Sequence, residues 1–578
     1  MAKDQDKREG AGEGAALVRE DKPAAHTAGP DPAKPTRPVS RVEPRAKEPG
    51  GAPPAPSWLS PRNRTILFWA GAGLCVLLVS MRLLHLGGDF PAFKDLLGDG
   101  VLYSDEGWYA ANAIYYWQSG EWHRPGGLNF AVNLPVLQLM HLASFAIFGM
   151  NIIAARLTIF FSYVGTMVLM YLLLRRFEDR WTGLFAVGIV SVNFLFLIYS
   201  RIALAEIPMT FWIMVSIYLA VHTHGSKGWV LSGLAGLAYG LAFYTKTSAA
   251  FALPVLMMAL FLTNWGSREK WLKPLPALGV FVIIVVAHFL LLARRYPEDF
   301  AYFHTLNVGL QASLDPNVLM EYGKRLIDRV QIVDRVYYRV MRILVPLLIL
   351  FDSRFRRNPL VWFSIAWIVL YIGMYTFYVN LRPRYWPPLM VPYGILSALI
   401  LKHLYLQATR HLLGKILLVG FIGLTALGVA RQARQVHWYL TNVEYSFQEF
   451  AGDIHEIMSA DPEWNNVLLG HFAPTVSLYK EDIIPVTDRF RSGKLEEQIE
   501  AFRPRYIITE DHIDKVDFVD EHGRTHTMEH LPGSYPERLE TLSTYYDIHL
   551  VDRFDVYRNY MDWQIWLYRL EPKPALGW

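Results

Sequence analysis

Two adjacent carboxylates, Asp105 and Glu106, follow the first long apolar segment in a stretch rich in Trp and Tyr. Carboxylates can take a proton from a sugar hydroxyl, and aromatic faces pack against sugar rings. The stretch at residues 103–109 therefore indicates a carbohydrate site. It also fits an ordinary helix start, in which Ser104 or Asp105 caps a helix over residues 106–118. Both interpretations can hold together.

Further charged residues stand at the ends of other apolar runs. Glu206 closes the stretch 200–206, and Lys246 lies between two short apolar segments. Ionisable groups in such surroundings are functional candidates by default. Any single basic side chain can instead extend toward the lipid headgroups. The candidate cations are Lys246, Arg384, Arg201 and Arg382.

These residues together predict a specific chemistry. A lipid-linked phosphate leaving group needs cations where its charge develops, and an attacking hydroxyl needs a general base, here Asp105 or Glu106. Glu206 is a second acid that could hold sugar hydroxyls, orient the base or help to bind a cation. The residues expected to contact sugar or acceptor are Tyr109, Trp108, Glu206, His304 and Tyr385.

The composition indicates a membrane protein. Of 578 residues, 52% are hydrophobic and 19% are charged, which is too apolar for a soluble chain of this size. Repeated apolar runs near the length that spans a bilayer predict a polytopic helical membrane protein. The net charge is +4 and the basic residues are dispersed, so no nucleic-acid partner is expected. With Cys75 as the single cysteine, no disulfide within the chain can form.

Eleven transmembrane helices are predicted between residues 65 and 431. Residues 1–64 alternate Pro, Ala, Gly and charge, which predicts a disordered tail. Arg62 and Arg64 would hold this tail in the cytoplasm, with the first helix as an uncleaved anchor. The predicted spans are 65–86, 152–174, 181–199, 207–222, 229–245, 248–263, 274–292, 342–352, 359–379, 385–402 and 415–431.

This topology places residues 88–151, with both acids, outside the membrane. It depends on a helix at 134–148 that lies along the outer surface. If that helix crossed instead, the basic cluster at 175–180 would fall outside, against the usual distribution of charge. Residues 326–340 read as an amphipathic surface helix or, equally, as an ordinary solvated basic face.

From about residue 432 the chain has the character of a small extracytoplasmic α/β domain. Strands are predicted at 466–469, 505–508 and 564–567, and helices at 446–459 and 495–502. No Gly-rich phosphate loop opens any of these helices, so nucleotide binding is not expected. Scaffolding is the expected role, with acceptor selection as the alternative.

Across residues 65–402 the sequence resembles the GT-C membrane glycosyltransferases, especially bacterial relatives of protein O-mannosyltransferases and of the lipid A aminoarabinose transferase. The resemblance rests on residues 104–106 followed by Tyr109, on 200–204 leading to an acid, on 240–243 with Lys246, and on Arg384-Tyr385 before two prolines. It implies a dolichyl- or undecaprenyl-phosphate sugar donor and Asp105 as the catalytic base.

Two departures from the family pattern limit what the resemblance implies. Many relatives have Asp where Glu206 stands, and a Lys- or His-Pro-Pro sequence where this chain has residues 132–135. The second change removes a polar contact at the donor site, so the sugar and the acceptor class do not carry over. Some GT-C enzymes use a divalent cation and others do not; the metal question stays open.

We therefore expect a multi-pass glycosyltransferase of the plasma (inner) membrane, with the active site and the C-terminal domain extracytoplasmic. Its partners would be membrane lipids, a polyprenyl-phosphate sugar and an acceptor that is a glycolipid, an envelope polysaccharide or a protein. One alternative is an oligosaccharide transferase or ligase that uses a diphosphate-linked glycan. The other is a non-catalytic glycolipid-binding or transport protein, although the internal repeats of many transporters are not apparent.

Overall fold

The computed structural model describes most of the chain from residue 60 onward. The described residues are 60–89, 102–127, 129–225, 227–301, 320, 324, 335–376, 383–487, 495–510, 517–519, 525–527, 541–556 and 563–574. The predictions for His304, Arg382, the tail before residue 60 and most of the helix at 326–340 lie outside these residues.

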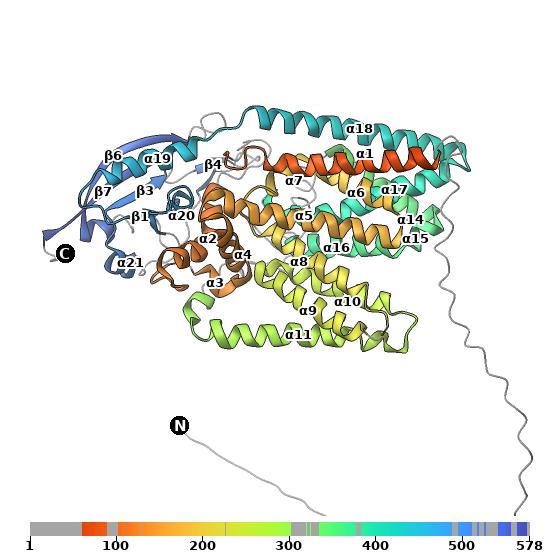
Figure 1. The fold of residues 1–578 in the computed structure, drawn as a ribbon, viewed down its shortest axis with the longest axis horizontal. Coiled ribbons are helices and arrows are strands. Elements are labelled where there is room, and N and C mark those ends of the chain that lie inside the picture. Colours follow the sequence, from red (N-terminus) through yellow and green to blue (C-terminus); the bar gives the residue numbers. More distant parts are fainter. Residues whose placement is uncertain are drawn as a thin grey trace, which may run out of the picture. The chain divides into compact units, whose positions relative to one another are not determined.

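Most of the described residues form helices, drawn in Figure 1. Those of the apolar part are α1 (Pro61–Ser80), α4 (Pro135–Phe148), α5 (Ile152–Phe177), α6 (Arg180–Ser191), α7 (Phe194–Tyr199), α8 (Glu206–Ala220), α9 (Gly228–Thr245), α10 (Ala252–Thr263), α11 (Pro274–His288), α14 (Arg335–Phe351), α16 (Pro359–Thr376), α17 (Met390–Ala408) and α18 (Leu412–Thr441).

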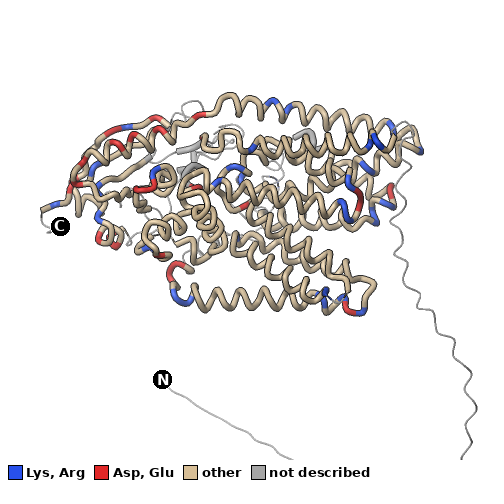
Figure 2. The backbone as a smooth tube through the Cα atoms, in the orientation of Figure 1, with Lys and Arg blue, Asp and Glu red and all other residues tan. Residues whose placement is uncertain are grey.

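Five helical segments in the described part of the chain are long and apolar enough to cross a membrane. They are Pro61–Leu83, Ile152–Phe177, Arg268–Ala293, Pro387–Ala408 and Leu412–Ser459. In Figure 2 the helices show long uncharged stretches, with charged residues gathered mainly at helix ends and in the C-terminal domain. The chain is a multi-pass helical membrane protein, as predicted; the number of eleven spans stays a prediction.

Several predicted boundaries are corrected. The single span expected at 181–199 is two helices, because Asn193 interrupts the run and its side chain caps α7 by accepting from the Phe196 amide at 3.2 Å. The first helix begins at Pro61 with Ser60 as its cap, so Arg62 and Arg64 lie inside it. The helix α18 continues to Thr441, past the domain boundary predicted at 431/432.

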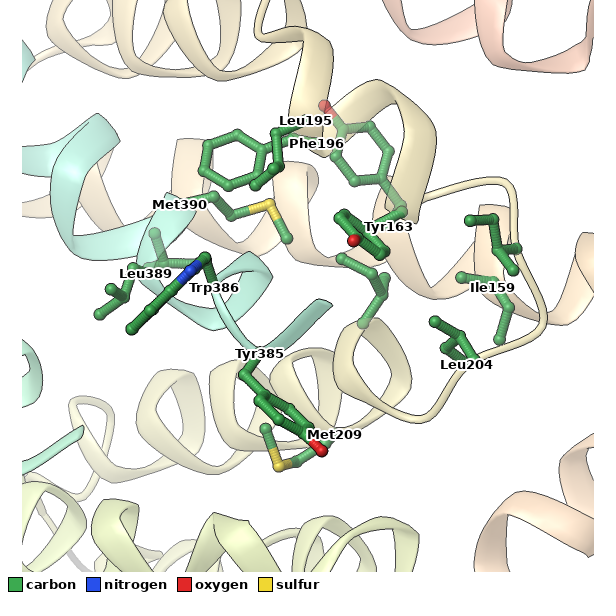
Figure 3. Close-up of a cluster of buried hydrophobic side chains, with 14 of the residues drawn as sticks. Ile159, Tyr163, Leu195, Phe196, Leu204, Met209, Tyr385, Trp386, Leu389 and Met390 are labelled. Carbon is green, nitrogen blue, oxygen red and sulfur yellow. The ribbon is translucent and has the colours of Figure 1, made fainter. Parts of the chain in front are cut away.

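The helices pack around α5, α8 and α17, and α5 and α17 are mostly buried. Figure 3 shows a part of this core, in which Tyr385 lies beside Met209, Met390 lies beside Leu195 and Phe196, and Leu204 lies beside Ile159. The short segment before α17 and the loop before α8 are therefore anchored in the same apolar cluster. This anchoring fixes the positions of the charged residues beside them.

The C-terminal domain contains a five-stranded sheet. The strands are β1 (Val467–Gly470), β2 (Ile484–Val486), β3 (Tyr506–Glu510), β6 (Tyr546–Val556) and β7 (Trp563–Pro572), in the order β2-β1-β3-β7-β6. Strand β1 pairs in parallel with β2 and β3, whereas β7 pairs antiparallel with β3 and β6.

Helices complete this domain. They are α19 (Ser446–Ser459), α20 (Ala473–Ser477) and α21 (Leu495–Phe502), and a separate two-stranded sheet joins β4 (Asp517–Val519) to β5 (Thr525–Thr527). The predicted helices and the three predicted strands are confirmed. Strands β2, β4, β5 and β6 were not predicted. Strand β2 has three residues and contains a proline, and β6 is mostly exposed, with four Asp or Arg among its 11 residues.

Candidate active site

The helix α2 (Leu102–Ser119) carries both predicted acids in its first turns. Because the helix starts at Leu102, Ser104 and Asp105 lie inside it and do not cap it, which corrects that prediction. Asp105 is 5% exposed and forms an ion pair with Arg384, which belongs to the 3-10 turn Pro383–Tyr385. The pair joins segments that lie 279 residues apart in the sequence.

A second buried ion pair joins Lys246 and Glu206. Lys246 directly follows α9 because the helix ends at Thr245, and Glu206 is the first residue of α8. The second carboxylate oxygen of Glu206, Oε2, is buried and has no hydrogen-bond partner among the described residues. Such an oxygen is costly to leave unpaired, so it is available to a ligand.

Aromatic rings connect the two ion pairs. The Lys246 Nζ atom lies 4.9 Å from the centre of the Tyr385 ring and 5.8 Å from that of Tyr109, and the Arg384 Cζ atom lies 5.3 Å from the Tyr385 ring. Tyr385 therefore contacts both cations through its negative π face. The structure thus brings Asp105, Glu206, Lys246 and Arg384 together with Tyr109 and Tyr385, as the sequence suggested.

Glu106 has a different environment from Asp105. Its two oxygens accept from Arg156 at 2.8 and 2.6 Å, and Oε1 also accepts from the Ala203 amide at 2.8 Å. Arg156 in turn donates to the carbonyls of Leu86 and Gly88, each at 2.7 Å. This buried bidentate pair joins α2, α5 and two loops, and it commits both oxygens of Glu106 to structural contacts.

Arg156 was missed by the sequence reasoning. Its signal was a lone arginine near the start of an otherwise apolar span, a position where an ionisable residue needs a partner. The partner could not be identified from sequence because Glu106 stands 50 residues earlier.

Two other predicted site residues contact different partners. Trp108 is buried and donates from Nε1 to the His471 carbonyl at 2.9 Å, so it joins α2 to the C-terminal domain. Arg201 donates to the carbonyls of Leu84 and His85 at 2.5 and 2.6 Å, and its guanidinium lies 5.1 Å from the Tyr439 ring. These contacts lie at the end of the first helical segment and at α18, not at Lys246.

The C-terminal domain packs tightly on the helix that holds the acids. The Gly107 amide donates to Thr475 Oγ1 at 3.2 Å, and a Cβ at Gly107 would lie 2.2 Å from the Thr475 nitrogen. Only glycine allows this approach of α2 to α20. Near the other end of α2, Trp117 Nε1 donates to Glu481 at 2.8 Å.

Comparisons with known proteins agree with this arrangement. The family model for dolichyl-phosphate-mannose-protein mannosyltransferase matches residues 126–303. An uncharacterized protein of Aquifex aeolicus is 28% identical over 312 residues, which are 51% of this chain and 59% of the relative. An undecaprenyl phosphate-alpha-4-amino-4-deoxy-L-arabinose arabinosyl transferase of Pseudomonas aeruginosa is 26% identical over 398 residues, covering 64% of this chain and 67% of the relative.

Among solved structures, ArnT from Cupriavidus metallidurans bound to undecaprenyl phosphate has a TM-score of 0.55 at 15% identity, covering 88% of this chain and 98% of that chain. The fold is therefore similar to that of ArnT. The predicted resemblance is confirmed: the chain is related to the GT-C superfamily glycosyltransferases, to ArnT and to the protein O-mannosyltransferases.

Proposed function

We propose that this protein is a membrane glycosyltransferase that moves a sugar from a polyprenyl-phosphate donor to an extracytoplasmic acceptor. The observation that carries the proposal is the cluster of two cations and two carboxylates around Tyr385, drawn from four separate segments. Lys246 and Arg384 would donate hydrogen bonds to a phosphate. Asp105 and Glu206 would accept hydrogen bonds or protons from hydroxyl groups. The related enzymes support a lipid-linked donor.

Asp105 is the proposed general base. The acceptor hydroxyl loses its proton to Asp105 as its oxygen bonds to the anomeric carbon, and the bond from that carbon to the phosphate oxygen breaks. Polyprenyl phosphate leaves with the electron pair, and Lys246 and Arg384 stabilise its charge. One base and one leaving group suffice for a single displacement, so the product has inverted configuration.

The pairing of Asp105 with Arg384 suggests that the donor binds before Asp105 acts as a base. A donor phosphate competes for Arg384 because guanidinium binds phosphate and carboxylate in the same bidentate manner. Donor binding would thereby release Asp105 from its ion pair and leave it free to accept a proton. Glu106 is not released in this way, because Arg156 and Ala203 hold it elsewhere.

The proposed location is the plasma membrane, with the site and the C-terminal domain on the extracytoplasmic side. The distribution of basic residues along the sequence supports this orientation. The residues before α1 would form the cytoplasmic tail, α1 to α18 the transferase domain, and the residues after Thr441 the outer domain. The acceptor would be a glycolipid, an envelope polysaccharide or a protein.

The test compares wild type with Asp105→Asn in purified form, with a panel of polyprenyl-phosphate sugars and acceptor mixtures. Transfer should collapse by about 10²- to 10⁴-fold in the variant while donor binding persists. Asp179→Asn is the matched control, because it also removes the charge of a carboxylate, at the C-terminal end of α5, whereas the candidate site lies near the N-terminal end of that helix. Donor binding without transfer by wild type would favour a binding protein, and use of diphosphate-linked glycans alone would favour a ligase.

A chelator arm tests the predicted option of a divalent cation. Within the residues that the structure describes, no three His, Cys, Asp or Glu side chains gather closely enough to hold a metal ion. Wild-type transfer that stops with a chelator and returns with added metal would assign a cation to the reaction.

A further inference from the structure

The side chain of Gln138 bridges two backbone groups of α2. Gln138 lies on α4 and is fully buried. Its Nε2 donates to the carbonyl of Tyr109 at 2.5 Å, and its Oε1 accepts from the amide of Ala113 at 3.0 Å. Residues four apart are those whose amide and carbonyl pair directly in an α-helix. One amide side chain therefore contacts both members of a single helical pair.

The bridged turn directly follows the turn that carries Asp105. Residues 105 and 109 are four apart, so their side chains lie on the same face of α2. On that face Asp105 pairs with Arg384, and the Tyr109 ring lies 5.8 Å from Lys246. A change in the pitch of the bridged turn would therefore move both side chains relative to their cations.

An uncharged amide is the side chain suited to this bridge. Gln offers a donor and an acceptor on one planar group, as the two backbone atoms require. Methionine has similar length but neither bond, and an ionised glutamate cannot donate to the Tyr109 carbonyl. The bridge therefore requires the amide group of Gln at position 138 and not only a side chain of its length.

Gln138 acts from a different side than the C-terminal domain does. The domain contacts α2 through Gly107 and Trp108, which bond to Thr475 and His471. Gln138 reaches α2 from α4, which packs between α2 and the membrane helices α5 and α9. The first turns of α2 are therefore fixed relative to both parts of the chain.

We propose that Gln138 is a positioning residue for the transfer reaction. It touches no reacting atom, and it sets the backbone of α2 so that Asp105 and Tyr109 face Arg384 and Lys246. The inference rests on the proposed function for its effect on turnover. The bridge itself can be tested without turnover.

The experiment compares wild type with Gln138→Met and Gln138→Glu in the full-length protein in lipid. The Met variant should lose about tenfold to 100-fold in kcat with little change in KM for the donor, because misplaced groups slow chemistry more than binding. The control is Gln432→Met, since Gln432 is also buried and accepts from a backbone amide, that of Phe194 at 2.7 Å. It should keep its kcat.

The Glu variant separates the hydrogen bonds from the volume of the side chain. A protonated carboxyl has one O–H donor and one acceptor and can restore the bridge, so the ratio of its kcat to that of wild type should rise as pH falls. The same ratio for the Met variant should stay flat. His141, three residues from Gln138 on α4, and Tyr109, whose carbonyl Gln138 contacts, are the neighbouring ionisable groups; both are present in every variant, so their titration affects both ratios alike.

Hydrogen exchange at the Ala113 amide gives the readout that is independent of turnover. Exchange at Ala113 should accelerate in the Met variant, whereas the amides of α5 and α8 should keep their protection. An unchanged kcat in the Met variant, or a Glu variant that stays impaired at every pH, would overturn the proposal. If wild type transfers no sugar, the proposed function fails, and the exchange rate of Ala113 alone decides whether the bridge exists.

Discussion

The two ends of the helices α5 and α17 hold their charged residues in different ways. One end is the candidate active site, where Arg156 and Arg384 lie near the starts of these helices. The other end, which we call the capping end, contains Glu178, Asp179 and Lys402. The same two helices thus provide both environments.

At the capping end, acidic side chains satisfy helix termini. Asp179 accepts from the amides of Trp181 and Thr182, each at 2.9 Å, and pairs with Lys402 at 2.8 Å. Asp352 likewise caps the short helix Ser353–Arg356 and accepts from His403 at 3.0 Å. These carboxylates have backbone partners that no ligand can replace without unwinding a helix.

In the candidate site, the acids that face the aromatic cluster pair with cations instead. Asp105 pairs with Arg384 and Glu206 with Lys246. An anionic ligand can replace a carboxylate beside a cation without breaking any helix. Under the proposed function, the carboxylates of the capping end stabilise the fold, whereas those of the candidate site exchange partners when the donor binds. Glu106 is the exception in the site, because its partners resemble those of the capping end.

The largest expected effect is a loss of stability when the ion pair of Glu106 is broken. Arg156→Met leaves the Glu106 carboxylate buried without its cation and should destabilise the protein by about 3–5 kcal/mol. Lys402→Met at the capping end should cost less, since Lys402 and Asp179 are partly exposed and Glu178 keeps its hydrogen bond from Asn358. Thermal unfolding in lipid nanodiscs measures both. Equal losses of stability would contradict the contrast between the two ends.

The second prediction exchanges one cation for another at each end. Arg384→Lys keeps the charge beside Asp105 but loses the planar fork, so transfer should fall by about 10²-fold while the fold is retained. Lys402→Arg at the capping end should leave transfer unchanged. Steady-state kinetics with the donor identified in the panel measures the effect. A fully active Arg384→Lys protein would show that the guanidinium does not bind the phosphate.

The sequence pointed to Asp105, Glu206, Lys246 and Arg384 as candidates, but it missed Arg156 and did not reveal the partner of Glu106. Asp105, Lys246 and Arg384 stand out because each is an ionisable group next to an apolar run, which is a local property. The pairing of Glu106 with Arg156 and the contact of Trp108 with His471 depend on the tertiary fold, because 50 and 363 residues separate the partners.

For the fold, too, the sequence predicted the general class but not all of the details. That the chain is a helical membrane protein follows from the length of its apolar runs, and single substitutions hardly change that length. The break between α6 and α7 depends on one polar residue, Asn193, whose side chain caps a new helix. Strand β6 was missed because it is a mostly exposed strand with charged residues along much of its length, so it lacks the apolar alternation that marks a strand.

A smaller effect is expected from removing a cap. Asp179→Ala deletes the bonds to the Trp181 and Thr182 amides and should cost about 1 kcal/mol of stability. Transfer should not change, because the residue lies at the capping end. The loss should appear as faster hydrogen exchange in the first turn of α6. A variant with normal α6 protection but reduced transfer would break the proposed separation of stability and function.

The smallest effect is a dependence of stability on pH. Burial alone would raise the pKa of Asp179, but hydrogen bonds from Lys402 and Thr182 lower that pKa below its ordinary value. The stability from this group is therefore present above the ordinary pKa of aspartate and is lost as pH falls through the lowered value. Asp179→Asn keeps an acceptor for the cap and should remove this acid sensitivity of α6. Exchange rates of the α6 amides across the acid range measure it, and an identical pH profile in the variant would assign the sensitivity to another carboxylate.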